Sequence, residues 1–116
     1  MAEKAIRQVV AYKRYFLDFY EEQPGPAQRK IEWILNLCRR LDRIPEKYFR
    51  HLTGTTGLYE IRIEWEGNIF RVFAFFDKGN LIVLGNGFRK KTAKTPAAEI
   101  ERALNIKAEY ENEKRK

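Results

Sequence analysis

The chain contains 116 residues, of which 44% are hydrophobic and 14% aromatic, which predicts one folded domain over residues 1–116 and argues against intrinsic disorder. Its 23 lysines and arginines outnumber its 16 acidic residues and give a net charge of +7, which favours a polyanionic partner such as nucleic acid or an acidic protein. No apolar run reaches the roughly 18 residues of a membrane span, and the first residues lack the apolar core of a secretory signal, so we expect a cytoplasmic protein without a membrane partner.

The N-terminal part of the chain predicts one strand and two helices. Residues 5–12 are rich in β-branched side chains, which is typical of a strand. Residues 15–20 form an aromatic segment that predicts a short helix, ended by the helix-breaking residues 24–26. From Ala27 the apolar residues recur at spacings of three and four, which predicts an amphipathic helix that ends before Pro45.

The middle of the chain predicts a meander of three antiparallel strands, because the apolar period becomes that of a strand after a basic connector at residues 47–56. The strands are expected at residues 58–65, 69–76 and 81–88, with turns at residues 67–68 and 77–80. The first turn places Glu64 opposite Arg71. It puts the apolar residues of both strands on one face and the charged residues on the other, outside the core.

The C-terminal part predicts a basic loop, residues 89–96, followed by a helix. Thr95 and Pro96 suit the N-cap and the first helical position. The tail over residues 109–116 is almost entirely polar, and we expect it to fray. The order of strand, two helices, three-stranded meander and helix predicts an α+β fold.

The predicted pairing gathers positive side chains into a cluster that suits a phosphate group. Arg62 and Arg71 share the charged face of adjacent strands, beside Glu60 and Glu64. The third strand and the loop after it add four cations: Arg89, Lys90, Lys91 and Lys94. Guanidinium and ammonium groups bind phosphate oxygens and stabilise the extra negative charge of a phosphorane.

Phosphodiester cleavage at this cluster needs no metal if a ribose 2′-hydroxyl attacks the phosphate, which favours RNA over DNA. With one cysteine, Cys38, and one histidine, the chain offers few metal ligands, and it has no glycine-rich nucleotide motif, so we expect no cofactor. A proton acceptor is still required, and Glu60, Glu64 or a lysine with a lowered pKa are candidates. His51 is a further candidate for proton transfer.

Simpler interpretations apply to the same residues. Alternating charges on a sheet usually form solvated cross-strand pairs, as Glu64 and Arg71 would here. Residues 89–94 also fit a solvated loop, and His51 fits a structural or exposed histidine. Cys38 lies on the apolar stripe of the predicted helix and fits the core.

Three segments of the chain together resemble the RelE/ParE superfamily of toxins. They are LYEIR at residues 58–62, FRVF at residues 70–73 and GFRKKTAKTP at residues 87–96. More closely, they are similar to the HigB-like, phage-derived branch, and the resemblance spans most of the chain with the elements in the same order. It implies a toxin of a type II toxin–antitoxin pair, an endoribonuclease that enters the ribosome and cleaves translated mRNA without a metal.

The resemblance also implies partners and residue roles. The expected partners are a helix-turn-helix antitoxin of the HigA-like kind, the ribosome and mRNA. Arg62 and Arg71 match arginines that contact or stabilise the scissile phosphate. Lys90 and Lys91 match the basic pair at the end of the last strand, and Lys94 matches the lysine of the KTP segment, so we assign these three to RNA binding or transition-state stabilisation.

The chain differs from several ribonucleases of this superfamily in its proton-transfer residues. Those enzymes have a tyrosine or histidine near the last strand or final helix, where this chain has Phe88, Thr92 and Thr95, with Tyr110 further along. The superfamily also contains ParE-type inhibitors of DNA gyrase. A gyrase inhibitor and a non-catalytic, antitoxin-binding module of the same fold are therefore the alternatives.

Apolar residues are also expected on the side of the sheet that carries Arg71. They are Phe73, Phe75, Ile82 and Leu84. This surface is too apolar to remain wholly in water, so we expect the final helix or an antitoxin segment to cover it.

Overall fold

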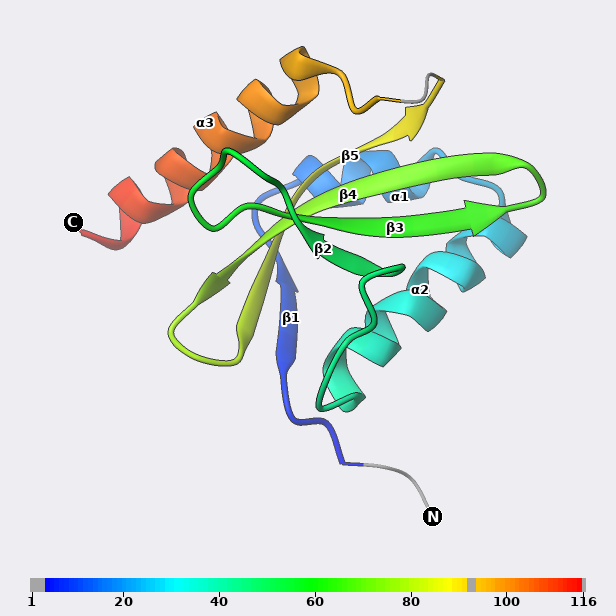
Figure 1. Cartoon of the computed structure of the whole chain (residues 1–116), viewed down its shortest axis with the longest axis horizontal. Helices are drawn as coiled ribbons and strands as arrows, with labels where there is room; N and C mark the ends of the chain where they lie inside the picture. Colours follow the sequence, from blue (N-terminus) through cyan, green and yellow to red (C-terminus); the bar gives the residue numbers. More distant parts are fainter. Residues whose placement is uncertain (1–3, 92–93, 116) are drawn as a thin grey trace.

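A five-stranded sheet lies at the centre of the fold (Figure 1). The computed structural model describes residues 4–91 and 94–115. In chain order the elements are β1 (Gln8–Ala11), α1 (Tyr15–Glu21), α2 (Gly25–Arg40), β2 (Phe49–His51), β3 (Tyr59–Trp65), β4 (Asn68–Asp77), β5 (Leu81–Lys90) and α3 (Ala97–Lys114). The strand order is β1-β5-β4-β3-β2, with β1 parallel to β5 and the other neighbours antiparallel. The predicted α+β class is confirmed, and none of these helices is long and apolar enough to cross a membrane.

Helices cover both faces of the sheet, with α2 and α3 on opposite sides (Figure 1). On one face the predicted apolar stripe of α2, including Ile31 and Ile34, packs in the same buried cluster as Val72 of β4. On the other face Ala103 of α3 packs against Phe73. Each face therefore carries its own apolar core, and the face that holds the charged residues of β3 is also partly buried.

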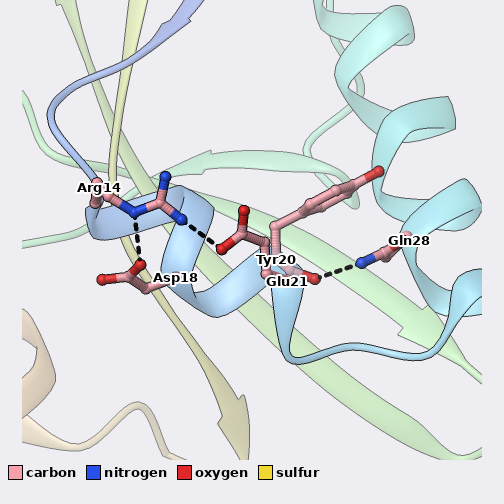
Figure 2. A network of polar contacts seen from close by, with 5 residues as sticks. All are labelled: Arg14, Asp18, Tyr20, Glu21 and Gln28. Carbon is pink, nitrogen blue, oxygen red and sulfur yellow. Dashed lines mark hydrogen bonds and ion pairs between the residues drawn. The ribbon is translucent and has the colours of Figure 1, made fainter.

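The hairpin of α1 and α2 carries the polar contacts drawn in Figure 2. The side-chain amide of Gln28 donates a hydrogen bond to the carbonyl oxygen of Tyr20 at 2.9 Å, which joins the two helices. Arg14 pairs with Asp18 at 3.0 Å and also with Glu21, within or next to α1. These ion pairs are exposed and contribute little to stability, so apolar packing against the sheet mainly holds the hairpin.

The turn between β3 and β4 lies one residue earlier than the sequence predicts. Glu66 and Gly67 are its central residues, with φ angles of 45° and 77°, because the preferred two-residue hairpin turn needs positive φ at both positions and favours glycine at the second. Arg71 therefore lies opposite Arg62, and Glu64 lies opposite Ile69. The predicted pair of Glu64 with Arg71 is wrong. The predicted faces are nevertheless correct, since the partner shift of two residues preserves the alternation of side chains.

The turn between β4 and β5 changes which apolar residues face α3. Its three residues, 78–80, place Asp77 opposite Leu81, so Ile82 and Leu84 point to the face of α1 and α2. The prediction that they lie beside Arg71 is wrong, whereas Phe73 does lie there, under α3. A β-bulge between Val72 and Ala74 then shifts the pairing by one residue, so that Phe88 lies on the Arg71 face and stacks on Phe73 at 5.6 Å.

Two segments are more ordered than the sequence indicates. Part of the predicted connector, residues 49–51, forms the edge strand β2 against β3. The tail that was expected to fray is helical, and α3 continues to Lys114. Two contacts with the carboxylate of Asp77 hold it: Tyr110 donates a hydrogen bond at 2.5 Å, and Lys114 forms an ion pair at 2.5 Å. Both corrections depend on contacts with residues distant in sequence.

The predicted N-cap of the last helix is also wrong. Pro96 occupies the N-cap position of α3, and the carbonyl oxygen of Pro96 accepts hydrogen bonds from the amides of Glu99 and Ile100 at 3.1 and 3.3 Å. The Thr95 hydroxyl donates instead to Glu60 of β3 at 2.7 Å. Thr95 thus ties the start of α3 to the charged face of the sheet.

Gly87 allows α1 to approach β5 closely. A Cβ atom at this position would lie 2.6 Å from the ring of Phe19, and 2.7 Å from the ring carbon nearest its backbone. We expect Gly87→Ala to lower the free energy of unfolding by about 1 to 3 kcal/mol through overpacking, as measured by urea denaturation.

Gly85 of the same strand provides the matched control. A Cβ atom there would make only ordinary contacts, at 3.6 Å to the Phe73 carbonyl oxygen and 3.7 Å to Ile106. Gly85→Ala is therefore expected to be neutral or to stabilise the fold by about 0.4 to 1 kcal/mol. Equal losses in the two variants would show that a general cost of adding a side chain to β5, and not the Phe19 contact, causes the effect.

Candidate functional site

A cleft of about 770 Å³ lies over the α3 side of β2, β3 and the end of β5, bounded by the start of α3. The cleft is lined by five of the residues that the sequence predicts for the site: His51, Glu60, Arg62, Lys90 and Lys94. Thr95 also lines it, and Arg50 of β2, which lies opposite Glu60 in the strand register, contributes a further cation.

Below the cleft, a buried ion pair joins the two central strands. Arg71 Nε lies 3.0 Å from Glu60 Oε1, and the two side chains are only 2% and 6% exposed. Arg62 Nε lies 3.8 Å from the same carboxylate oxygen, and the Thr95 hydroxyl donates to the other one at 2.7 Å. Glu60 therefore holds both arginines and the start of α3 around a single carboxylate.

The strand register explains why Glu60 must lie there. Arg62 and Arg71 are direct partners across β3 and β4, and two like charges in such positions repel each other. Glu60 is two residues from Arg62 on the same face of β3, within reach of both guanidinium groups. Burial lowers the pKa of Arg71, while Glu60 acts in the opposite direction, and a guanidinium remains charged at neutral pH.

Lys90 is the cleft residue whose proton affinity is most clearly changed by its surroundings. It lies opposite Ile69 at the end of β5, on the same face as Arg71, and is half-buried. Burial lowers the pKa of Lys90, and the positive charges of Arg71, Arg62 and Arg50 lower it further against the attraction of Glu60. Such a lysine gives up its proton more readily than a solvated one.

Some sequence-predicted residues do not converge on this cleft. Arg89 is exposed and lies opposite Phe70, so it belongs to the other face of the sheet. Lys91 is exposed beyond the end of β5 and does not line the cleft. Glu64 is exposed and lines a separate hollow beside α2.

His51 lies at the wall of the cleft, but its side chain is directed elsewhere. It pairs with Tyr59 across the β2–β3 ladder, and the two rings lie 5.3 Å apart. Its Nε2 atom is 3.1 Å from the carbonyl oxygen of Thr55. His51 therefore shares the side of Tyr59, and not that of Glu60.

The remaining sequence expectations concern proton-transfer residues and the core. Tyr110 lies at the other end of α3, where burial and the hydrogen bond to Asp77 raise its pKa to about 12. Thr92 lies outside the described residues. Cys38 is buried in the core as predicted, and burial raises the pKa of its thiol to about 11.

Sequence reasoning missed Arg50 and the role of Thr95. Arg50 lies in a strand of three residues, which is too short for its alternation to stand out, although buried Phe49 beside exposed Arg50 is consistent with it. The hydroxyl of Thr95 could not be assigned to Glu60 because the two residues are 35 positions apart.

Comparisons with known proteins give a family match and one similar fold. The model of the family described as "Phage derived protein Gp49-like (DUF891)" matches residues 18–108. Among solved structures, the chain is similar to an archaeal RelE–RelB complex from Pyrococcus horikoshii OT3, with 15% sequence identity, a TM-score of 0.50, and coverage of 77% of this chain and 98% of that chain. A comparison with curated protein sequences finds no significant match. The arrangement of three helices and a five-stranded sheet is thus similar to that of RelE.

Proposed function

We propose, because the chain belongs to the phage-derived Gp49-like family and has a fold similar to RelE, that it is the toxin of a type II toxin–antitoxin pair and cleaves RNA without a metal. The observation that carries this proposal is the cleft in which Arg62 and half-buried Lys90 lie above the ion pair of Arg71 and Glu60. A phosphate in the cleft would meet cations from three strands.

The geometry supports attack by a ribose 2′-hydroxyl on the adjacent phosphate, which forms a 2′,3′-cyclic phosphate as the bond between phosphorus and the 5′-oxygen breaks. Water supplies the proton that the leaving 5′-oxygen takes up. Lys90 in its neutral form accepts the hydroxyl proton, since its pKa is lowered. Glu60 is less suited to this role because both of its oxygens are already engaged, by Arg71 and Thr95. Arg62, which lines the cleft, stabilises the charge that develops on the phosphorane oxygens. Arg71 is buried and acts as a positioning residue that holds Glu60 and lowers the pKa of Lys90.

The proposed substrate is mRNA on the ribosome, and the proposed partner is an antitoxin of the helix-turn-helix, HigA-like kind. The net charge of +7 supports a polyanionic substrate such as an mRNA within the ribosome. The archaeal protein with the similar fold was crystallised with RelB, which supports an antitoxin as the partner of this chain.

The proposal is tested by producing the protein in bacteria without its antitoxin and mapping new 5′ ends on translated mRNAs. We expect codon-phased cuts that fall by about 100-fold in Arg62→Ala, which removes one stabiliser of the developing charge. Arg89→Ala is the matched control, because Arg89 is an exposed arginine of the same predicted cluster but lies on the other face of the sheet. It should cut like the unmodified protein.

Other outcomes would contradict the proposal in different ways. Growth arrest with intact transcripts and induction of the DNA-damage response would favour the gyrase inhibitor of the ParE type. Normal growth together with tight antitoxin binding would favour a non-catalytic module. Cuts that disappear equally in Arg62→Ala and Arg89→Ala would place the site elsewhere.

A further inference from the structure

A second basic surface, outside the cleft, combines cations with the exposed ring of Trp33 and the half-buried ring of Tyr48. A hollow of about 340 Å³ between α2 and the loop before β2 is lined by Lys30, Lys47, Tyr48, Arg62 and Glu64, over the buried side chain of Ile34. The indole of Trp33 lies next to it and is 46% exposed, one of the few large apolar side chains of the described residues that remain in water. We call these residues the α2 platform.

The rings of the α2 platform are held in fixed positions by their neighbours. Trp33 and Tyr48 are in edge contact at 6.0 Å, and their planes are nearly perpendicular, at 89°. Lys30 Nζ lies 4.7 Å from the centre of the Trp33 ring, and Lys47 Nζ lies 4.9 Å from the centre of the Tyr48 ring. The backbone of Tyr48 is anchored to β3, because its carbonyl oxygen accepts a hydrogen bond from the amide of Arg62 at 2.8 Å.

We infer that the α2 platform binds single-stranded RNA that continues from the cleft. Arg62 lines both the cleft and the platform hollow, so a backbone bound at one can extend to the other without leaving positive surface. Three cations face one carboxylate, that of Glu64, in the hollow. Exposed aromatic faces beside lysines and arginines are the usual means of binding unpaired nucleotides, because every base can stack and every phosphate attracts a cation. The choice of RNA as ligand rests on the proposed function.

The inference is tested with a labelled single-stranded poly(A) RNA of about ten nucleotides, in the range that one such domain covers, and with its 2′-deoxy counterpart, which 2′-hydroxyl attack cannot cleave. We expect Trp33→Ala to weaken the binding of both by roughly 5- to 150-fold, the effect of losing one stacked base, in a protein that stays folded. The chain contains two tryptophans, so in a Trp65→Phe variant the fluorescence of Trp33 alone can be followed. It should be quenched on binding.

The contribution of the platform lysines is measured separately by salt dependence. The variant Lys30→Gln/Lys47→Gln removes two phosphate contacts, so the slope of log affinity against log salt should become shallower by about 1.4. The control variant Lys4→Gln/Lys78→Asn removes two exposed lysines outside the platform and cleft, and the slope should not change. Asparagine is chosen for position 78 because its backbone has a φ angle of 40°.

The outcomes separate this inference from the proposed function. Unchanged affinity and unquenched Trp33 fluorescence, with mRNA cuts still lost in Arg62→Ala, would overturn the platform and leave the cleavage cleft standing. Weaker RNA binding by Trp33→Ala in a protein that cuts no transcripts would support the platform and contradict the nuclease. Loss of antitoxin binding in Trp33→Ala, with RNA affinity unchanged, would identify the platform as a protein interface and overturn the RNA assignment.

Discussion

Arg71→Met is expected to lower the free energy of unfolding by about 3 to 5 kcal/mol, because it leaves the buried carboxylate of Glu60 without its main positive partner. The same variant is expected to lower RNA cleavage by at least about 100-fold, since the cleft loses the charge beneath its floor. Urea denaturation measures the first effect. Mapping of 5′ ends on translated mRNAs measures the second.

Loss of stability and loss of function can be separated by removing both charges of the pair. In the double variant Arg71→Met/Glu60→Gln no charge of the pair is left buried, so this protein should regain most of the stability that Arg71→Met loses. The loss in the double variant should be smaller than the sum of the two single losses by a coupling energy of up to about 3 kcal/mol. The side-chain oxygen of the glutamine introduced at position 60 can still accept the hydrogen bond from Thr95. Cleavage should remain lost in this folded protein.

The double variant also decides whether breaking the ion pair causes the loss of stability in Arg71→Met. If the losses of Arg71→Met and Glu60→Gln simply add, the two side chains do not act as a pair, and packing of the Arg71 side chain beneath α3 explains the instability instead. If the double variant regains its cleavage together with its stability, Arg71 has no part in the reaction beyond maintaining the fold.

Lys90→Met is expected to reduce the cleavage rate by about 100- to 10,000-fold, the usual contribution of a positioned base. The physical reason is that the pKa of Lys90 is lowered by burial and by Arg71, Arg62 and Arg50, so that its neutral form is available closer to neutral pH. Because the neutral amine is the proposed base, the rate of the unmodified protein should rise with pH as Lys90 loses its proton. Single-turnover cleavage of mRNA on purified ribosomes, measured from about pH 6 to pH 9, checks this profile.

Lys90→Arg distinguishes proton transfer from simple charge. Arginine keeps the positive charge but does not lose its proton in this pH range, so the variant should be as slow as Lys90→Met and should not gain rate with pH as the unmodified protein does. Arg89→Ala should keep the profile of the unmodified protein, which controls for the effect of pH on the ribosome. A Lys90→Arg variant with nearly full activity would mean that Lys90 only binds phosphate.

Features that depend on residues close together in the chain could be predicted from the sequence. The apolar stripe of α2 and the alternation in β3 and β4 are local, because a helix repeats about every 3.6 residues and a strand every two. This is why the sequence correctly predicts that Arg62, Arg71 and Glu60 share one face of the sheet. The predicted faces are correct even though the predicted turn is wrong. Moving the turn by one residue changes each cross-strand partner by two residues, so every side chain stays on the same face.

Features that depend on turn length and on distant contacts required the tertiary structure. A three-residue turn at residues 78–80 changed the face of Ile82 and Leu84, and a strand as short as β2 gave Arg50 no detectable pattern. The sequence also predicted that the charged face of the sheet lies outside the core, yet Arg71 is buried.

The sequence by itself determined the α+β class and the grouping of the arginines and Glu60 on one face of the sheet. Only the tertiary structure decided that Arg71 lies beneath the cleft, that Arg89 faces away from it, and that Lys90 is half-buried among arginines. The reason is physical. The periodicity of the sequence indicates which side chains share a face, whereas their burial and pKa depend on what packs against that face. Here α3 packs against it, and Thr95, just before α3, contacts Glu60 of β3 from 35 residues away.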